Sequence, residues 1–291
     1  MVQYREKVSS GRSRKDFFEG VVFRILLRLN SGREGENLAV FSRDPVGLAI
    51  ASMGVFEGDM LEFLFRYLDV QGLIVGAALD VGANVGNHSL FFARYYEAVE
   101  SFEPHPVTFQ LLGVNARLEK RISVHNWGAS DVEGILDLYN EPHSFGGASL
   151  HPHRADPSLQ RYQIAVRPLD AAPHLSDRKI GLIKIDVEGH ELNVLRGATR
   201  LIRKNRPVIL FEQHAGDFDS TGRSEVIEYL RSQSYSKFAI VKRGHGKAVA
   251  NKHSVARAFG LLQRLCLGYS MSLELVNDVP PGFHSAVLAL P

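Results

Sequence analysis

Acidic side chains and closely spaced glycines follow a short apolar run early in the chain. The apolar residues 77–79 lead into Asp80, and a turn bounded by Gly82 and Gly86 follows at once. Glycine lets a backbone turn tightly and approach a ligand, because no Cβ stands in the way. A helical pattern begins directly after Gly86, so the N–H groups of a helix start would face the same ligand. The spacing predicts a strand, a turn and a helix, the first unit of a nucleotide-binding α/β sheet.

The middle of this turn distinguishes between nucleotide ligands. A dinucleotide motif needs a glycine where this chain has Asn84, and that side chain would obstruct the close approach of a pyrophosphate. Asp80 would repel a phosphate but could hold an ammonium group, directly or through water. A ligand with an amino-acid end and a nucleoside end meets these conditions better than a dinucleotide does. We therefore expect S-adenosylmethionine (SAM) as the ligand.

A second carboxylate stands where a ribose would be bound. Residues 98–102 predict the next strand, and Glu103 follows it roughly 20 residues after Asp80, the separation typical of a strand–helix–strand unit. Pro104 and Pro106 end the strand, and Pro106 can open the next helix. An isolated loop acid would be solvated, but the position of Glu103 after the glycine turn favours contact with ribose hydroxyls.

The remaining chemistry gathers in residues 182–191, where another apolar run ends in an acid. Ligands of open α/β sheets lie beyond the carboxyl ends of the strands. Four acids would all stand at that edge: Asp80, Glu103, Asp186 and Glu212. Because like charges repel, we expect a cationic ligand or a metal ion to offset them.

Structural roles are open for the side chains that follow the second apolar run. Glu188 and Glu191 could be favourable charges in a first helical turn. Asp186 could cap that helix, and His190 could be a surface histidine. We expect helix capping to explain Glu188 or Glu191 but not the whole of Asp186.

No metal ligand is predicted. Mg²⁺ held by Asp186 and Glu212, with His214, is a geometric alternative that we do not favour, because Mg²⁺ usually binds through few protein carboxylates. His151 and His153 form a His-x-His pattern, but loop histidines of this kind are more often solvated than bound to zinc.

The composition is that of an ordinary globular protein. The 291 residues are 45% hydrophobic and 23% charged, and the net charge of +2 gives no reason to expect nucleic acid as a partner. Cys266 is the single cysteine in the sequence, which excludes an intrachain disulfide and a cysteine metal cluster. No signal-peptide pattern is visible, and the apolar stretch at 17–29 is too short and too charged to span a bilayer. We therefore expect a cytoplasmic protein without a transmembrane segment.

Apolar runs and helical patterns alternate from residue 77 onward. Strands are expected at 77–81, 98–103, 122–127, 182–186, 208–212, 237–241 and 285–290, with an extra pair at 135–139 and 162–168. Helices are expected at 60–68, 87–96, 106–118, 190–204 and 224–232. This alternation predicts an α/β fold with a doubly wound, mostly parallel sheet that has helices on both faces.

Two segments stand outside this alternation. Residues 1–70 are expected to form an N-terminal helical extension, which contains the apolar stripe at 17–29. Residues 71–291 are expected to form the main domain, with 244–284 inserted before the last strand. An amphipathic helix expected at 254–267 and the stripe at 17–29 are compatible with a lid, a partner surface or a homodimer.

Six segments between residues 56 and 241 form an ordered set of motifs: 79–86, 102–104, 169–170, 183–191, 194–198 and 206–212. This set resembles the motifs of the FkbM-type methyltransferases. The resemblance implies a seven-stranded, Rossmann-like class I fold and a SAM-dependent transfer of a methyl group. The acceptor it implies is a hydroxyl of a sugar, glycan or other small natural product.

The resemblance also implies roles for the matched positions. The glycine turn would line the methionine end of SAM, Glu103 would bind its ribose, and residues 126–131 would lie near its adenine. Residues 54–58 could lie over the same pocket. The predicted cofactor-binding residues are Glu57, Asp80, Gly82, Ala83, Asn84, Gly86, Asn87, Glu103, Pro104, Asn126, Ala129 and Ser130.

The predicted catalytic residues are Asp186, Glu188 and His190. An alcohol must lose its proton as the methyl group is transferred, and His190 is the first candidate for the base because its unperturbed pKa lies near neutrality. Asp186 could orient His190, bind the acceptor hydroxyl or act as the base itself.

Other functions are open at this point. A catalytically silent nucleotide-binding or interaction protein could keep the same fold, although Asp80, Glu103 and Asp186 argue against it. A nicotinamide-dependent oxidoreductase is disfavoured by the missing middle glycine. Methylation of nucleic acid is disfavoured by the near-neutral net charge.

Overall fold

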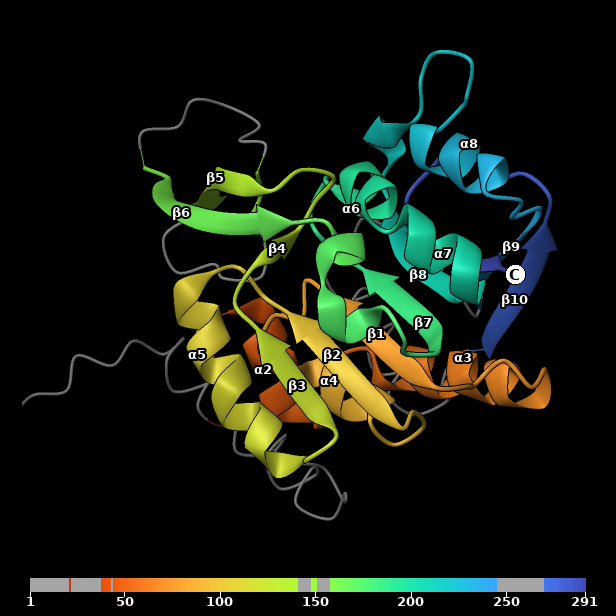
Figure 1. Cartoon of the computed structure of the whole chain (residues 1–291). Helices are drawn as coiled ribbons and strands as arrows, with labels where there is room; N and C mark the ends of the chain where they lie inside the picture. Colours follow the sequence, from red (N-terminus) through yellow and green to blue (C-terminus); the bar gives the residue numbers. More distant parts are fainter. Residues whose placement is uncertain (1–20, 22–37, 43, 141–147, 151–157, 245–269) are drawn as a thin grey trace, which may run out of the picture.

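A large sheet and a small sheet organise the computed structural model, which describes residues 21, 38–42, 44–140, 148–150, 158–244 and 270–291. Within these residues the large sheet has eight strands in the order β10-β9-β11-β8-β7-β1-β2-β3. The small sheet has three strands in the order β4-β6-β5 (Figure 1).

The strands of the large sheet are β1 Ala77–Val81, β2 Ala98–Phe102, β3 Ile122–His125, β7 Ile180–Ile185, β8 Val208–Gln213, β9 Lys237–Gly244, β10 Ser270–Val276 and β11 His284–Leu290. The small sheet comprises β4 Gly128–Ala129, β5 Gly134–Asn140 and β6 Gln160–Arg167. The pairs from β3 through β2, β1 and β7 to β8 are parallel, whereas β11 and β10 make antiparallel pairs. Every residue of β1 and β7 is buried, as expected for central strands covered on both faces.

The described helices are α2 Pro45–Met53, α3 Gly58–Val70, α4 Asn87–Phe92, α5 Pro106–Asn115, α6 Glu191–Gly197, α7 Thr199–Asn205 and α8 Glu225–Ser232. Short 3-10 turns are η1 Ala116–Leu118, η2 Leu169–Ala171, η3 Pro173–Leu175 and η4 Ala215–Asp217. Helices α6, α7 and α8 lie on one face of the large sheet, and α3 and α4 lie on the other (Figure 1). Their apolar side chains pack with the sheet. The predicted doubly wound α/β fold is therefore confirmed.

Helix α3 shows how the second face is covered. Its buried residues follow the 3.6-residue period of a helix and are Met60, Leu61, Leu64, Phe65 and Leu68. The Phe65 ring stacks on that of Phe92 in α4, with 5.4 Å between the ring centres. Burial of each large apolar side chain contributes about 1.5–3 kcal/mol, so this helix is an integral part of the core.

Several elements differ from the sequence-based expectation, among them the unexpected strand β4. The helix expected at 190–204 is divided at Ala198 into α6 and α7. A Cβ on Gly197 would lie only 1.9 Å from the carbonyl oxygen of Ser130, so the end of α6 packs directly against the loop after β4. The strand β10 was not expected; it pairs with β9 and gives the large sheet one strand more than the seven predicted, within the described residues.

Two other expectations cannot be compared with the structure. The apolar stripe at 17–29, except Val21, and the helix expected at 254–267 lie outside the described residues. Among the helices that the structure describes, none has the length and apolarity needed to cross a membrane.

Candidate functional site

A cavity lies where the carboxyl ends of β1, β2 and β7 face the small sheet. It encloses about 710 Å³, including its open mouth. The polar part of its wall consists of Gly82, Asn84, Glu103, Asp186, Glu188 and His190. Apolar side chains of the small sheet, Leu138, Ile164 and Val166, form the opposite part. Both chemical motifs of the sequence thus line one cavity, at the sheet edge where ligands of such folds bind.

The glycine turn is shaped by its neighbours in the fold. Gly82, Asn84 and Gly86 have φ angles of 76°, 49° and 90°, in the left-handed region that glycine and asparagine tolerate best. A Cβ on Gly82 would lie 1.8 Å from the carbonyl oxygen of Asp186. The sequence-based explanation, that Gly82 leaves room for a ligand, therefore needs correction: the space is filled by the backbone that follows β7.

Glu103 connects the glycine turn to the end of β2. Its Oε2 accepts a hydrogen bond from the backbone N–H of Asn84 at 3.0 Å, and its Oε1 accepts one from the N–H of His105 at 2.8 Å. Burial raises the pKa of this carboxyl to about 7, although the two N–H donors act in the opposite direction. The Asn126 amide donates to the carbonyl oxygen of Glu103 at 2.9 Å and fixes the backbone behind it. Contact between Glu103 and a ribose stays a prediction.

The acidic edge contains a cation that the sequence analysis did not single out. Lys184 Nζ lies 3.2 Å from Asp80 Oδ1, 3.4 Å from Asp186 Oδ2 and 2.8 Å from the carbonyl oxygen of Gly82. Asp80 has no exposed surface, and its Oδ2 accepts a hydrogen bond from the Ser89 hydroxyl at 2.6 Å. Lys184 therefore offsets these acids in part, and the expectation of a cationic ligand concerns the negative charge that remains.

Lys184 keeps its charge in this environment. Burial alone would lower the pKa of its ammonium group, but the carboxylates of Asp80 and Asp186 raise it above its usual value. The sequence signal was present, since Lys184 is the one charged residue in the apolar run 182–185. A charged residue in a central strand needs a buried partner.

His190 lies in the cavity wall and contacts one of the predicted adenine-side residues. Its Nε2 is 3.0 Å from the Ser130 hydroxyl, and both side chains are buried. The next residue, Asp131, accepts a hydrogen bond from Asn193 of α6 at 3.0 Å, which lowers the pKa of its carboxyl. The loop after β4 therefore fixes His190 and α6 together.

The segment expected over the pocket is attached to the start of α4. The Asn87 side chain accepts from the N–H of Phe56 at 2.9 Å and donates to its carbonyl oxygen at 3.0 Å. Glu57 Oε2 lies 3.7 Å from His88 Nε2. Burial, assisted by the nearby Lys184, lowers the pKa of His88 to about 4, so this histidine is neutral at physiological pH.

The predicted site residues fall into two groups. Those in the cavity wall are Gly82, Asn84, Glu103, Pro104, Ala129, Asp186, Glu188 and His190. The others lie outside the wall that the described residues form: Glu57, Asp80, Ala83, Gly86, Asn87, Asn126 and Ser130. Some of the second group contact the first, as Ser130 does His190, and the binding and catalytic roles of both groups stay predictions.

Glu212 in β8 is the fourth of the acids expected at the carboxyl edge of the large sheet. Burial, followed by the charge of Asp186, raises the pKa of its carboxyl to about 7. His214 Nε2 lies 3.8 Å from Glu212 Oε1. Among the described residues, Asp186, Glu212 and His214 do not form a converging set of metal-ligand atoms, and this counts against the Mg²⁺ alternative.

The profile of the methyltransferase FkbM domain matches residues 80–237, more than half of the chain. The match includes both motifs of the cavity wall, from the acid before the glycine turn to α6. The chain therefore belongs to the FkbM methyltransferase family.

Curated relatives include hexuronic acid methyltransferase AglP of Haloferax volcanii, which is 33% identical over 138 residues covering 47% of this chain and 55% of the relative. Methyltransferase sdnD of Sordaria araneosa is 30% identical over 152 residues, which cover 41% of this chain and 59% of the relative. The 31-O-demethyl-FK506 methyltransferase FkbM of Streptomyces tacrolimicus is 27% identical over 238 residues, with coverages of 68% and 89%. The chain thus matches little more than half the length of the first two relatives.

A solved methyltransferase FkbM from Methylobacillus flagellatus KT is 21% identical. The comparison covers 68% of this chain and 49% of that structure, with a TM-score of 0.35. The family assignment accordingly rests on the sequence match and not on this superposition.

Proposed function

We propose that the chain binds SAM and transfers its methyl group to a hydroxyl oxygen of a sugar, glycan or other natural-product acceptor. The observation that carries the proposal is that the glycine turn, Glu103 and His190 line one cavity. Such a cavity combines groups for a nucleoside ligand with a candidate base for the acceptor.

Glu103 and the loop after β4 would hold the nucleoside part of SAM. Each carboxylate oxygen of Glu103 accepts one backbone hydrogen bond, and each has a second lone pair for a ribose hydroxyl. Gly128 and Ala129 in the wall, beside the apolar side chains of the small sheet, offer a surface for the adenine. The proposal retains the role near the adenine that the family resemblance implied for residues 126–131.

The charge at the sheet edge suits a cationic donor. Asp80 and Asp186 carry two negative charges against the single positive charge of Lys184, and Glu188 adds another acid to the cavity wall. The positively charged ammonium and sulfonium groups of SAM would be attracted to this excess of negative charge. A dinucleotide phosphate would be repelled by it.

When bound, the sulfonium supplies an activated methyl group, so the protein chiefly aligns the acceptor oxygen with it. We propose that His190 takes the hydroxyl proton and that the Ser130 hydroxyl, 3.0 Å from its Nε2, supports its ring. Asp186, whose side chain is 41% exposed, would orient the acceptor hydroxyl or take the proton in its place.

The names of two relatives favour oxygen as the accepting atom. One is named as a methyltransferase of hexuronic acid and the other as a methyltransferase of 31-O-demethyl-FK506. The mixed polar and apolar wall of the cavity suits an acceptor that carries both hydroxyl groups and apolar surface.

Calorimetric titration of the purified chain with SAM, with NADH in parallel, tests the proposal. We expect saturable SAM binding that Glu103→Ala weakens and that Glu228→Ala, a change of an exposed acid on α8, leaves unaltered. Transfer of labelled methyl groups to hexuronic acids and hydroxylated natural products would then identify the acceptor. Binding of NADH in place of SAM, or of neither, would overturn the proposal, and SAM binding without turnover on any acceptor would favour the catalytically silent alternative.

A further inference from the structure

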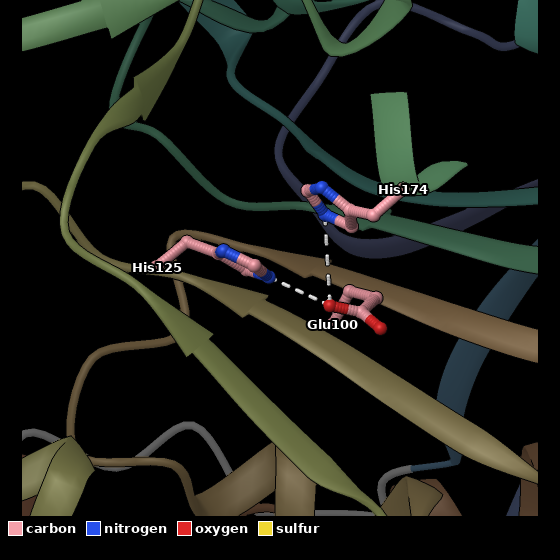
Figure 2. Close-up of side chains that lie close together, drawn as sticks. All are labelled: Glu100, His125 and His174. Carbon is pink, nitrogen blue, oxygen red and sulfur yellow. Dashed lines mark hydrogen bonds and ion pairs between the residues drawn. The ribbon is translucent and has the colours of Figure 1, made fainter. Parts of the chain in front are cut away.

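Two histidines and a glutamate converge outside the cavity wall. Glu100 of β2, His125 at the end of β3 and His174 in η3 bring one carboxylate oxygen and two ring nitrogens within 4.8 Å of one another (Figure 2). His125 Nε2 lies 2.6 Å, and His174 Nε2 lies 3.7 Å, from the same Oε2 of Glu100. These three residues are far apart in the sequence, and no motif joins them.

The fold holds the two imidazole rings parallel. In the β2–β3 pair, His125 lies opposite Phe102, and their rings stack with 4.7 Å between the centres. The ring of His174 also stacks with that of His125, with 4.7 Å between the ring centres and 18° between the ring planes. Figure 2 shows both rings directing a nitrogen to the Glu100 carboxylate. Stacking thus restrains the planes of both rings, and the contacts with Glu100 show which nitrogens face the carboxylate.

Ordinary ion pairing leaves part of this arrangement unexplained. Arg178 Nη1 lies 2.9 Å from Glu100 Oε1, so the buried carboxylate already has a cationic partner. A positive charge on both stacked rings would be repulsive. The 3.7 Å between His174 Nε2 and Glu100 Oε2 exceeds the length of a hydrogen bond. A proton shared by Glu100 and His125 therefore does not account for the position of His174.

We propose that Glu100, His125 and His174 bind a divalent transition-metal ion, and that their chemistry selects Zn²⁺. Two imidazole nitrogens and one carboxylate oxygen are a ligand set that zinc accepts, with water in the fourth position. Tetrahedral Zn²⁺ with bonds of about 2.0–2.1 Å separates its ligand atoms by roughly 3.3 Å, so binding would lengthen the 2.6 Å contact of His125 and shorten the 3.7 Å contact of His174. Mg²⁺ and Ca²⁺ prefer oxygen ligands and fit the two imidazoles poorly.

The surroundings suit such a site. Glu100 is 2% exposed, whereas His174 is 37% exposed and provides access from solvent. Arg178 binds the carboxylate oxygen that faces away from the histidines, in the way that outer residues orient metal-binding carboxylates. Its charge lies close to the proposed ion, and the 37% exposure of its side chain reduces this repulsion only in part.

A metal ion here would tie η3 to the β2–β3 edge of the large sheet. Phe102, which stacks on His125, also lines the cavity, and Glu103 follows it directly. Zn²⁺ would therefore stabilise the fold next to the proposed SAM site without contacting the reacting groups.

The test uses the full chain after removal of metals with a chelator. Titration with Zn²⁺ by calorimetry, and with Co²⁺ by the visible absorption of tetrahedral cobalt, should reveal one tight site. Zn²⁺ should also raise the melting temperature, because a ligand that binds the folded state stabilises it. His174→Ala and Glu100→Gln should each weaken Zn²⁺ binding roughly tenfold or more and abolish the shift in melting temperature.

Two control variants locate the site. His284→Ala removes a histidine whose Nε2 faces the carbonyl oxygen of Pro280 and should leave Zn²⁺ affinity unchanged. The double change of His151 and His153 to alanine removes the His-x-His pattern and should do the same. The His174 side chain is 37% exposed, so we expect His174→Ala to fold. Wild-type Zn²⁺ affinity in that variant would overturn the proposal. Loss of the tight site only in the His151/His153 variant would overturn it as well.

Discussion

Lys184 Nζ lies 3.2 Å from Asp80 Oδ1 because the two residues are register partners in the parallel β1–β7 pair. Both side chains are buried, with exposures of 4% for Lys184 and 0% for Asp80. The lysine also binds the carbonyl oxygen of Gly82, at the start of the glycine turn. The internal counter-ion of the acidic edge therefore also holds the two chemical motifs together.

Lys184→Met should leave Asp80 as a buried charge without its cation. Loss of one partner of a buried ion pair costs about 3–5 kcal/mol, and we expect a decrease of this size in the free energy of unfolding, measured by urea denaturation. Asp80→Asn combined with Lys184→Met should cost less than the sum of the single changes. Lys242→Met, which removes a surface partner of Glu274, is the control and should change stability little. Equal effects of the two lysine changes would contradict the role assigned to Lys184.

Gly82→Ala should disrupt the contact between the two motifs. Its Cβ would lie 1.8 Å from the Asp186 carbonyl oxygen, and the φ of 76° is itself unfavourable for alanine. We expect a loss of at least about 2 kcal/mol in the free energy of unfolding and loss of SAM binding. Gly113→Ala is the matched control, because no atom lies within 4 Å of its Cβ position in α5. That change should stabilise the helix by about 0.5–1 kcal/mol, and a destabilised Gly113→Ala variant would show that the comparison is not specific to the turn.

Glu103→Gln should change how stability depends on pH. Burial raises the pKa of Glu103 from 4.5 to about 7 in the folded chain. Between these values the folded state binds more protons than the unfolded state, so the contribution of Glu103 to stability falls as pH rises. The variant lacks this titration and should show a smaller decrease in the free energy of unfolding between about pH 5 and pH 8, by on the order of 1–3 kcal/mol. Parallel pH profiles of the variant and the wild type would rule out the raised pKa.

Ser130→Ala distinguishes contact with the cofactor from support of the base. The Ser130 hydroxyl lies 3.0 Å from His190 Nε2. If it positions His190, kcat should fall about tenfold with a shifted pH profile, while the Kd for SAM stays the same. His190→Gln should lower kcat by about 10²–10⁴-fold, and Ser232→Ala on α8 should lower neither quantity. A raised Kd for SAM in Ser130→Ala with an unchanged pH profile would instead support the role near the adenine that the sequence suggested.

The sequence predicted the fold well because its central strands are buried on both faces. The expected strand at 77–81 coincides with β1, and that at 182–186 overlaps β7, whose burial is complete. Pro106 does open α5, and His105 caps it by accepting from the N–H of Thr108. Local patterns were sufficient to predict these elements, because a buried strand and a helix start each depend on a few neighbouring residues.

The site was predicted less completely, because several of its contacts join distant parts of the chain. The partnership of Lys184 with Asp80 depends on the β1–β7 register, which no local pattern specifies. The cluster of Glu100, His125 and His174 likewise depends on the β2–β3 register and on the position of η3. Gly197 packs closely on Ser130 where α6 ends. This contact between distant residues leaves no mark in the hydrophobic pattern of the sequence.

The pairing of β9 with β10 brings Gly244 opposite Ser270, so residues 245–269 leave and rejoin the sheet at adjacent positions. The distance between these two ends is set by the strand pair and not by the length of the segment. Because the entropy cost of closing a loop grows only slowly with its length, this edge is a permissive position for insertion or exchange of sequence. A reporter domain with neighbouring termini could be fused there while β11 keeps its register with β8 and β9.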